Sequence, residues 1–327
     1  MKRFNTITGQ ELFNKELQEI PFVVKDLIPI GVTLLAGSAK VGKSWLALWL
    51  AVQIAKGEDV WGYESIKCTT LYLAYEDNEI RIQNRLLEIC DDAPENVHFC
   101  TEVSKLGGDF ESKIDSFITE HKNTKLIIID TLQTIRTTTE SSYSNDYSDL
   151  TVLKTLADRY KIAIILIHHF RKQKDGDVFN QITGSTGLQG AVDNMFTLSA
   201  SRRGERMATL NCIGRDIEPR EIELERNDDN VWIKKSESYS ESNILEENFV
   251  KAIEEFMSDK TSYCGTPTEL STLLNEISDS KFSNRVISKY VRKLSKSLEK
   301  RSIMGDYRRS NGKRIVELVK IGVDSAT

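Results

Sequence analysis

The sequence predicts an α/β fold in which a mostly parallel sheet carries helices on both faces, followed by a small α+β domain. Two observations predict the large domain. Apolar runs rich in β-formers alternate with longer helical stretches, and a glycine-rich loop separates the first run from an apolar helix. The pattern becomes mostly helical beyond residue 243, which predicts the small domain, and 327 residues suffice for both.

Four short apolar runs predict the central strands of the sheet. Their continuous apolar character is typical of strands covered on both faces, and they are too short and too β-branched for helices. The runs are 32–36, 70–75, 126–129 and 162–167. Two later runs, 194–200 and 207–212, flank a hairpin-like turn, so we expect them to be antiparallel extensions of the sheet.

A polar stretch marks the predicted boundary between the domains. The predicted divisions are an N-terminal segment at 1–21, the large domain at 22–235, a linker at 236–243 and the small domain at 244–327. In the small domain we expect helices at 244–259, 268–277 and 284–300, then a hairpin that pairs 302–308 with 314–321. Short helices followed by a basic hairpin favour a winged helix-turn-helix.

The glycine-rich loop has the chemistry of a phosphate-binding site. Residues 37–44 read Gly-Ser-Ala-Lys-Val-Gly-Lys-Ser, the P-loop pattern, between a predicted strand and a predicted helix. Such a loop turns backbone N–H groups toward phosphates, and the helix N-terminus adds partial positive charge. We expect Lys43 to reach the β and γ phosphates and Ser44 to bind Mg²⁺, so ATP and Mg²⁺ are the predicted cofactors. The residues predicted to bind nucleotide are Gly37, Ser38, Ala39, Lys40, Val41, Gly42, Lys43, Ser44 and Trp45.

Two acidic residues follow predicted strands, where ligands of parallel sheets bind. Asp130 ends an apolar run; such a residue often only marks a strand end, but beside a P-loop it is expected to hold the magnesium shell. Many P-loop ATPases carry the catalytic glutamate directly after this aspartate, but here the next residue is Thr131. Glu76, which follows Tyr75, is therefore the predicted general base for the attacking water. The alternative is that Glu76 and Asp77 only cap the next helix.

The ordered set of motifs resembles the RepA-type replicative ATPases of plasmids and phages. They belong to the RecA-like class that also holds the DnaB- and KaiC-class proteins, hexameric helicases among them. The motifs are Gly-x4-Gly-Lys-Ser, Tyr-Leu-Ala-Tyr-Glu-Asp, Ile-Ile-Ile-Asp-Thr-Leu, Ile-Leu-Ile-His-His-x-Arg-Lys, Gly-Ser-Thr-Gly-Leu-Gln-Gly-Ala-Val-Asp-Asn and Gly-Arg-Asp-Ile. The resemblance runs from about residue 22 to 233, roughly two thirds of the chain, and implies a RecA-like P-loop core.

The resemblance also implies roles for residues beyond the P-loop. His168 and His169 match the position that senses the γ-phosphate, although a histidine after a strand is more often structural. The segment 171–185 matches loops that line the DNA pore, and its basic residues Arg171, Lys172 and Lys174 would follow a DNA backbone.

An arginine finger, projected into a neighbouring subunit's ATP site, is implied at Arg215. The family commonly carries a lysine two residues earlier, where this chain has Ile213, so the finger depends on Arg215 alone or on Arg220. An ordinary surface ion pair is the alternative for Arg215.

The C-terminal part of the chain is strongly basic. Residues 281–320 hold 13 Lys and Arg against 3 Asp and Glu, a charge of +10, whereas the rest holds 31 against 46, a charge of −15. Helical spacing places Arg285, Lys289 and Arg292 on one face, and Arg308, Arg309, Lys313 and Arg314 fall on the predicted hairpin. These residues predict a DNA-binding surface, with a subunit-docking domain as the alternative.

Together these features predict an oligomeric, ring-forming, hexameric, ATP-driven DNA helicase or translocase of a plasmid, phage or other mobile element. The second hypothesis is a RecA-like switch that acts as a replication initiator, loader or transcriptional regulator. A strand-exchange recombinase is disfavoured because no polymerisation segment is recognisable before residue 22. DNA and further copies of the chain are the expected partners.

The composition excludes some other classes. Without a signal sequence or an apolar stretch of about 18 residues, we expect a cytosolic protein that does not bind membranes. The five cysteines contain no C-x-x-C pair, so neither a zinc site nor a disulfide framework is expected.

Overall fold

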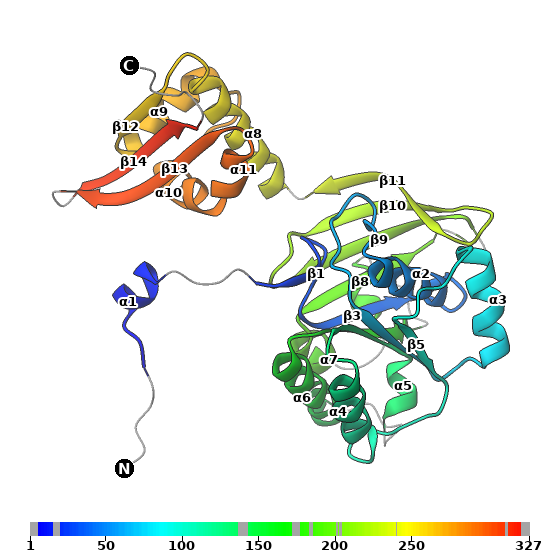
Figure 1. The fold of residues 1–327 in the computed structure, drawn as a ribbon. Helices are drawn as coiled ribbons and strands as arrows, with labels where there is room; N and C mark the ends of the chain where they lie inside the picture. The colour runs from blue at the N-terminus through cyan, green and yellow to red at the C-terminus, as the bar shows by residue number, and fades with distance from the viewer. Residues whose placement is uncertain are drawn as a thin grey trace, which may run out of the picture. The chain divides into compact units, whose positions relative to one another are not determined.

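The computed structural model describes residues 6–15, 20–136, 143–171, 177–182, 186–200, 202, 205–239, 241–310 and 313–321. The chain forms two compact units, Met1–Ser238 and Tyr239–Thr327 (Figure 1). Within the described residues, nine strands of the first unit form one sheet. From one edge to the other they are β11 Trp232–Tyr239, β10 Arg220–Arg226, β9 Met207–Gly214, β8 Asn194–Ser199, β3 Gly31–Gly37, β7 Ala163–His169, β6 Thr124–Asp130, β4 Thr69–Ala74 and β5 Val97–Cys100.

The sheet is mostly parallel, which confirms the predicted fold class. The strands from β8 through β3, β7, β6 and β4 to β5 run parallel. The four predicted central strands are found as β3, β4, β6 and β7 and are almost wholly buried, because their apolar runs are covered on both faces. All four end at one edge of the sheet, here called the carboxyl edge; the opposite edge is the amino edge.

One prediction about the sheet was wrong. The run 194–200 was expected to be an antiparallel extension, but β8 lies parallel to β3, with Thr33 opposite Asn194 and Gly37 opposite Leu198. The reason is the connection: α7 (Thr186–Ala191) lies between β7 and β8, and a helical crossover returns the chain to the amino edge. The antiparallel part begins at β9, which pairs with β8, and continues into β10.

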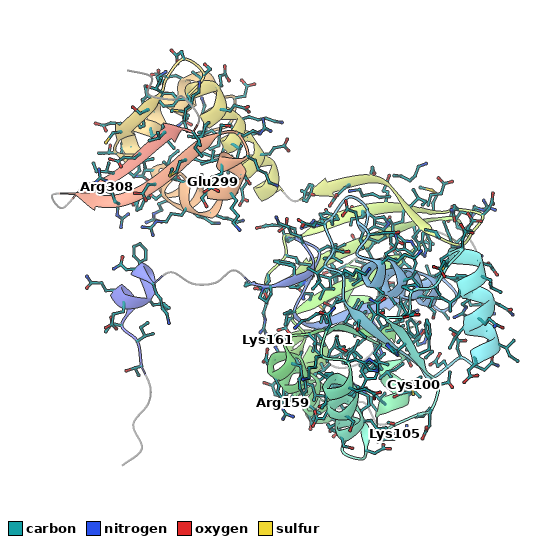
Figure 2. All side chains as sticks on the ribbon, in the orientation of Figure 1. Cys100, Lys105, Arg159, Lys161, Glu299 and Arg308 are labelled. Carbon is teal, nitrogen blue, oxygen red and sulfur yellow. The ribbon has the colours of Figure 1, made fainter. Side chains whose placement is uncertain are left out.

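Helices cover both faces of the sheet. On one face lie α2 (Lys43–Lys56) and α3 (Glu79–Ile89), and on the other lie α4 (Phe110–Glu120), α5 (Leu132–Ile135), α6 (Tyr143–Tyr160) and α7. Lys161, with a φ of 53°, turns the chain from α6 into β7 at the amino edge (Figure 2). The remaining elements of this unit are α1 Gly9–Asn14, β1 Phe22–Val24, β2 Ile28–Pro29 and the 3-10 helix Phe179–Gln181.

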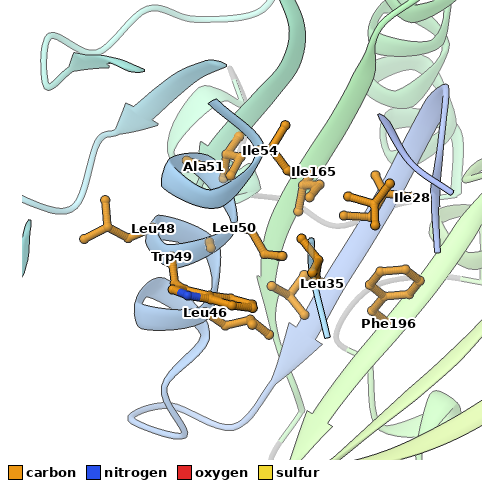
Figure 3. Close-up of a cluster of buried hydrophobic side chains, with 14 of the residues drawn as sticks. Ile28, Leu35, Leu46, Leu48, Trp49, Leu50, Ala51, Ile54, Ile165 and Phe196 are labelled. Carbon is orange, nitrogen blue, oxygen red and sulfur yellow. The ribbon is translucent and has the colours of Figure 1, made fainter. Parts of the chain in front are cut away.

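The helix that follows the glycine-rich loop is anchored by apolar packing. Leu46, Leu50 and Ile54 of α2 lie in one buried cluster with Leu35 of β3 and Ile165 of β7 (Figure 3). Full burial of one such side chain stabilises a fold by about 1.5–3 kcal/mol. The start of α2 is therefore held rigidly against the carboxyl edge of the sheet.

The second unit has its own sheet and its own core. In its described residues the strands run in the order β12 (Ser262–Gly265), β14 (Lys313–Lys320), β13 (Ile303–Ser310), all antiparallel. Its helices are α8 Glu241–Phe256, α9 Pro267–Ile277, α10 Asn284–Lys293 and α11 Ser295–Glu299. The buried core draws on all the helices and includes Phe249, Leu270, Ile287, Leu298 and Val316.

Two details of this unit differ from expectation. The helix expected over 284–300 breaks at Leu294, whose buried side chain ends α10 with φ −102° and ψ 16° and lets α11 pack separately. Strand β12 was not predicted, since its four residues gain their pairing only from β14. The boundary between the two units falls between Ser238 and Tyr239, within the stretch 236–243 that was predicted as a linker; β11 ends at Tyr239 and α8 begins at Glu241.

No helix within the described ranges is long and apolar enough to cross a membrane.

Candidate functional site

The loop between β3 and α2 has a backbone that few residue types can adopt. Lys40 and Gly42 have φ values of 66° and 104°. A Cβ on Gly37 would lie 2.5 Å from the Leu198 carbonyl oxygen, and one on Gly42 would lie 2.8 Å from the Trp232 ring. The glycines at both positions are therefore required by close packing, and the loop delivers its N–H groups to the N-terminus of α2.

Lys43 is buried at the centre of this loop. Its Nζ donates to the carbonyl oxygens of Gly37 at 2.8 Å and Ser38 at 2.9 Å. Burial lowers the pKa of Lys43 to about 8, while the carboxylates of Asp130 and Glu76 oppose that shift. A cation so poorly solvated is stabilised by any anion that enters the loop, so the site favours phosphate.

Asp130 lies at the end of β6 with its carboxylate buried. Tyr72 donates to its Oδ2 at 2.9 Å, and Ser44 also hydrogen-bonds to it. Burial raises the pKa of Asp130 in spite of these two bonds. The Ser44 hydroxyl and the buried Asp130 carboxylate thus lie together, and a divalent cation beside them would offset the cost of burying the carboxylate charge. Oxygen ligands of this kind are those that Mg²⁺ prefers.

Glu76 is not a helix cap, which settles the alternative left open by the sequence. The N-cap of α3 is Asn78, whose side chain accepts from the Arg81 N–H at 2.9 Å. Asp77 instead pairs with Arg81 at 2.6 Å and with Arg85 at 2.5 Å. Glu76 is exposed at the carboxyl edge, and its carboxylate accepts from the Thr131 hydroxyl at 2.9 Å.

The two histidines at the end of β7 have different surroundings. His169 is level with Gly37, and its Nδ1 lies 3.4 Å from Lys43 Nζ. Burial and the adjacent Lys43 lower the pKa of His169, which favours the neutral ring. His168 is level with Ala36 and buried, and alternation along the strand directs its side chain to the opposite face. The structure therefore brings only His169 to the phosphate-binding loop.

A comparison with protein-family models matches residues 3–175 to the AAA domain. The match covers more than half of the chain and contains the P-loop, Glu76, Asp130 and both histidines. The chain belongs to the AAA domain family. It therefore carries a P-loop ATPase domain, and nucleotide binding follows from that assignment. A search of curated proteins finds no match to the chain.

Arg215 lies beyond the AAA domain match and at the opposite edge of the sheet. Gly214, which precedes it, pairs with Asn194, and Asn194 pairs with Thr33 at the start of β3. The P-loop leaves β3 at Gly37, so roughly 15 Å of strand separates the two positions at about 3.3 Å per residue. The Arg215 side chain is 60% exposed, 3.5 Å from Asp193 Oδ1. Among the residues that the structure describes, Arg215 contacts Asp193 and Gly190 and no part of its own P-loop.

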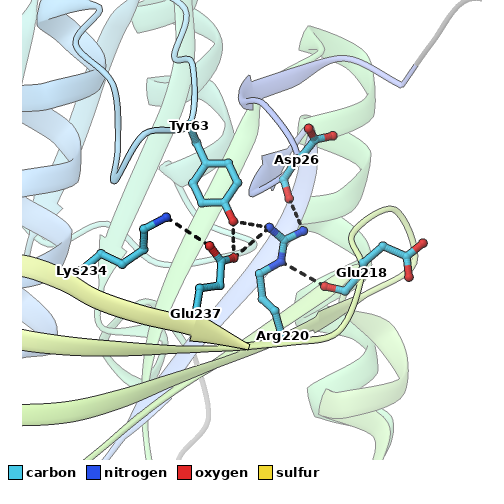
Figure 4. Close-up of polar contacts among 6 residues, drawn as sticks. All are labelled: Asp26, Tyr63, Glu218, Arg220, Lys234 and Glu237. Atoms are coloured by element: carbon cyan, nitrogen blue, oxygen red, sulfur yellow. Dashed lines mark hydrogen bonds and ion pairs between the residues drawn. The ribbon is translucent and has the colours of Figure 1, made fainter. Parts of the chain in front are cut away.

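Arg220, the alternative finger, is excluded by its contacts. It is 6% exposed, and its guanidinium donates to Tyr63 Oη at 2.6 Å and to the Asp26 carbonyl at 2.8 Å (Figure 4). Glu237 of β11 completes the cluster, with an oxygen 3.4 Å from Arg220. Arg220 ties β10 and β11 to the turn after β1, so it cannot extend toward a neighbouring AAA domain.

Arg220→Ala is expected to destabilise the first unit by about 3 kcal/mol, because the buried guanidinium and its bonds to Tyr63, Asp26 and Glu237 would be lost together. Urea unfolding followed by tryptophan fluorescence measures this unit alone, since all four tryptophans precede Ser238. Arg206→Ala is the control, because its ion pair with Asp228 is 61% and 85% exposed and should contribute less than about 1 kcal/mol. Equal stabilities of the two variants would contradict this role for Arg220.

The expected DNA-contacting residues are only partly described. Arg171 is exposed just after β7, while Lys172 and Lys174 lie outside the described residues. Arg285, Lys289 and Arg292 are exposed on α10, as helical spacing predicted, and Arg292 stacks 4.6 Å from the Tyr307 ring. Arg308 is exposed on β13 (Figure 2) and pairs with Glu317 of β14. Arg314 of β14 is also exposed. The side chains of Arg309 and Lys313 are not among those described.

Three residues of the site were missed from the sequence. Tyr72 and Thr131 hold the two carboxylates, and Trp232 lies beneath the P-loop, with its Nε1 3.3 Å from the Gly42 carbonyl oxygen. The alternation of β4 offers a signal for Tyr72, because Tyr72 and Ala74 share a parity and lie in one buried cluster with α2. Nothing in the sequence links Trp232 to Gly42.

Proposed function

We propose that this ATPase is an oligomeric, ATP-driven DNA helicase or translocase of the RepA type, acting in replication of a plasmid, phage or similar element. The observation that carries the proposal is the division of the ATP machinery between two sheet edges. Lys43, Asp130 and Glu76 gather at the carboxyl edge, whereas Arg215 is exposed at the amino edge. A site completed by a neighbouring copy is the arrangement by which ring motors link hydrolysis to movement.

Each residue has a defined part in the proposed hydrolysis. The P-loop N–H groups and Lys43 bind the phosphates, and Glu76 accepts a proton from the attacking water. Ser44 and Asp130 would hold Mg²⁺, which supplies charge neutralisation of the phosphates when bound. His169, adjacent to Lys43, would report loss of the γ-phosphate to the segment that begins at Arg171. Arg215 of a second copy would stabilise the charge on the transferring phosphoryl group.

The DNA contacts are assigned on charge and, where the structure describes the side chain, on exposure. Arg171, Lys172 and Lys174 would follow single-stranded DNA through a central pore, six copies of the chain forming the ring. The exposed basic side chains of α10 and of the β13–β14 hairpin would contact duplex DNA in a winged-helix arrangement. These assignments predict binding that weakens steeply as salt rises.

Strand separation on a forked duplex tests the proposal. We expect ATP-dependent release of the labelled strand and an ATPase rate that single-stranded DNA increases, both absent in Lys43→Ala. A second candidate, an ATPase switch that recruits or regulates, is favoured by the separate core and basic surface of the second unit. ATP hydrolysis without strand release on forks of either polarity would reject the helicase and support the switch.

A further inference from the structure

Thr131 follows one carboxylate of the ATP site in the chain and hydrogen-bonds to the other. It directly follows Asp130, is 1% exposed, and its Oγ1 donates to Glu76 Oε1 at 2.9 Å. The backbone joins the same strand ends, since the Tyr75 N–H donates to the Asp130 carbonyl at 2.9 Å. The segments that follow β4 and end β6 are thus linked by one main-chain bond, from Tyr75 to Asp130, and one side-chain bond, from Thr131 to Glu76.

The hydroxyl of Thr131 does not cap the helix that begins directly after it. Thr131 is the N-cap residue of α5, where threonine ordinarily accepts from an N–H of the first helical turn. Thr8 and Thr266 make such bonds at the starts of α1 and α9, but Thr131 makes none. Its Oγ1 instead donates to Glu76, and Thr134 Oγ1 lies 3.4 Å from Thr131 Oγ1. The Thr131 hydroxyl therefore bonds to Glu76 instead of capping α5.

A glutamate at this place needs a partner if it is to act as a base. Glu76 is exposed, and a side chain with three rotatable bonds loses considerable entropy when it is held in one conformation. The nearby arginines do not restrain its carboxylate, because Arg81 and Arg85 are paired with Asp77. A bond from the buried Thr131 fixes Oε1 and leaves Oε2 available for water.

We propose that Thr131 is a positioning residue that holds Glu76 in its reactive orientation; this inference rests on the proposed role of Glu76 as general base. Loss of such orientation lowers turnover without weakening nucleotide binding, since a displacement of about 1 Å can cost about 10²-fold in rate. Thr131 itself contacts no phosphate in this scheme.

Thr131→Val tests the inference, because valine keeps the β-branched shape and burial but cannot donate. We expect kcat for ATP to fall at least about tenfold with KM changed less than about twofold, and Thr131→Ser to restore most of the loss. Thr70→Val is the matched control: Thr70 is a fully buried threonine of β4, and its Oγ1 donates to the Ala51 carbonyl at 3.2 Å, outside the site. If Thr131→Val does not fold, Thr131→Ala is measured against the same criteria.

A double-mutant cycle separates positioning from a structural effect. In a Glu76→Gln background, Thr131→Val should leave the residual rate unchanged, since both substitutions act on one group. An equal further loss in that background would overturn the inference, as would wild-type kcat in Thr131→Val. Wild-type hydrolysis by Glu76→Gln alone would instead reject the base, and with it the proposed chemistry.

Discussion

Arg215→Ala is expected to lower kcat for ATP hydrolysis by about 10³-fold or more, because the transferring phosphoryl group would lose its guanidinium partner. ATP affinity and stability should change little, since the side chain is 60% exposed and Asp193 retains Lys154 at 2.7 Å. Steady-state hydrolysis, equilibrium binding and urea unfolding measure the three effects. Arg215→Lys should recover only part of the rate, because lysine keeps the charge without the forked donor geometry.

Mixing two inactive variants shows whether Arg215 acts on a neighbouring copy. An assembly of Arg215→Ala and Glu76→Gln chains contains interfaces with an intact Glu76 on one side and an intact Arg215 on the other. Random pairing at equal amounts gives about a quarter of such interfaces, so about a quarter of wild-type activity should return. If mixed assemblies are shown to form and yet do not hydrolyse ATP, Arg215 does not act on the ATP site of a neighbouring copy.

Glu76→Gln is expected to reduce kcat by about 10²–10⁴-fold while ATP still binds, because the amide cannot accept the proton of the attacking water. Bound nucleotide extracted from this variant should remain ATP, whereas the wild-type protein should yield ADP. Glu79→Gln is the control, since Glu79 is an exposed glutamate in the first turn of α3. Rapid conversion of bound ATP by Glu76→Gln would show that another group activates the water.

The central strands and the main site could be predicted from the sequence because both depend on local patterns. Runs such as 126–129 are apolar without alternation, which indicates a strand buried on both faces. Once β4 and β6 are parallel neighbours, the residues after them must meet at one edge, and Glu76 and Asp130 do so. The helical spacing of 284–300 likewise placed Arg285, Lys289 and Arg292 on one face, and all three are exposed on α10.

The features that were missed depend on contacts between distant parts of the chain. Arg215 and Arg220 are the same residue type five positions apart, and only burial against Tyr63 and Glu237 distinguishes them. The direction of β8 depends on a crossover helix of six residues. Trp232 approaches Gly42 from 190 positions away, a contact that only the assembled sheet creates.

The placement of the P-loop and Arg215 at opposite ends of the strands constrains the symmetry of any active assembly. In the proposed function each nucleotide needs the P-loop of one copy and Arg215 of another, so two unlike surfaces of the chain must meet. A head-to-tail contact repeated around a ring would supply every nucleotide with one arginine, and a two-fold contact would do so only where the carboxyl edge of each copy lies against the amino edge of the other. An isolated copy should therefore hydrolyse ATP slowly.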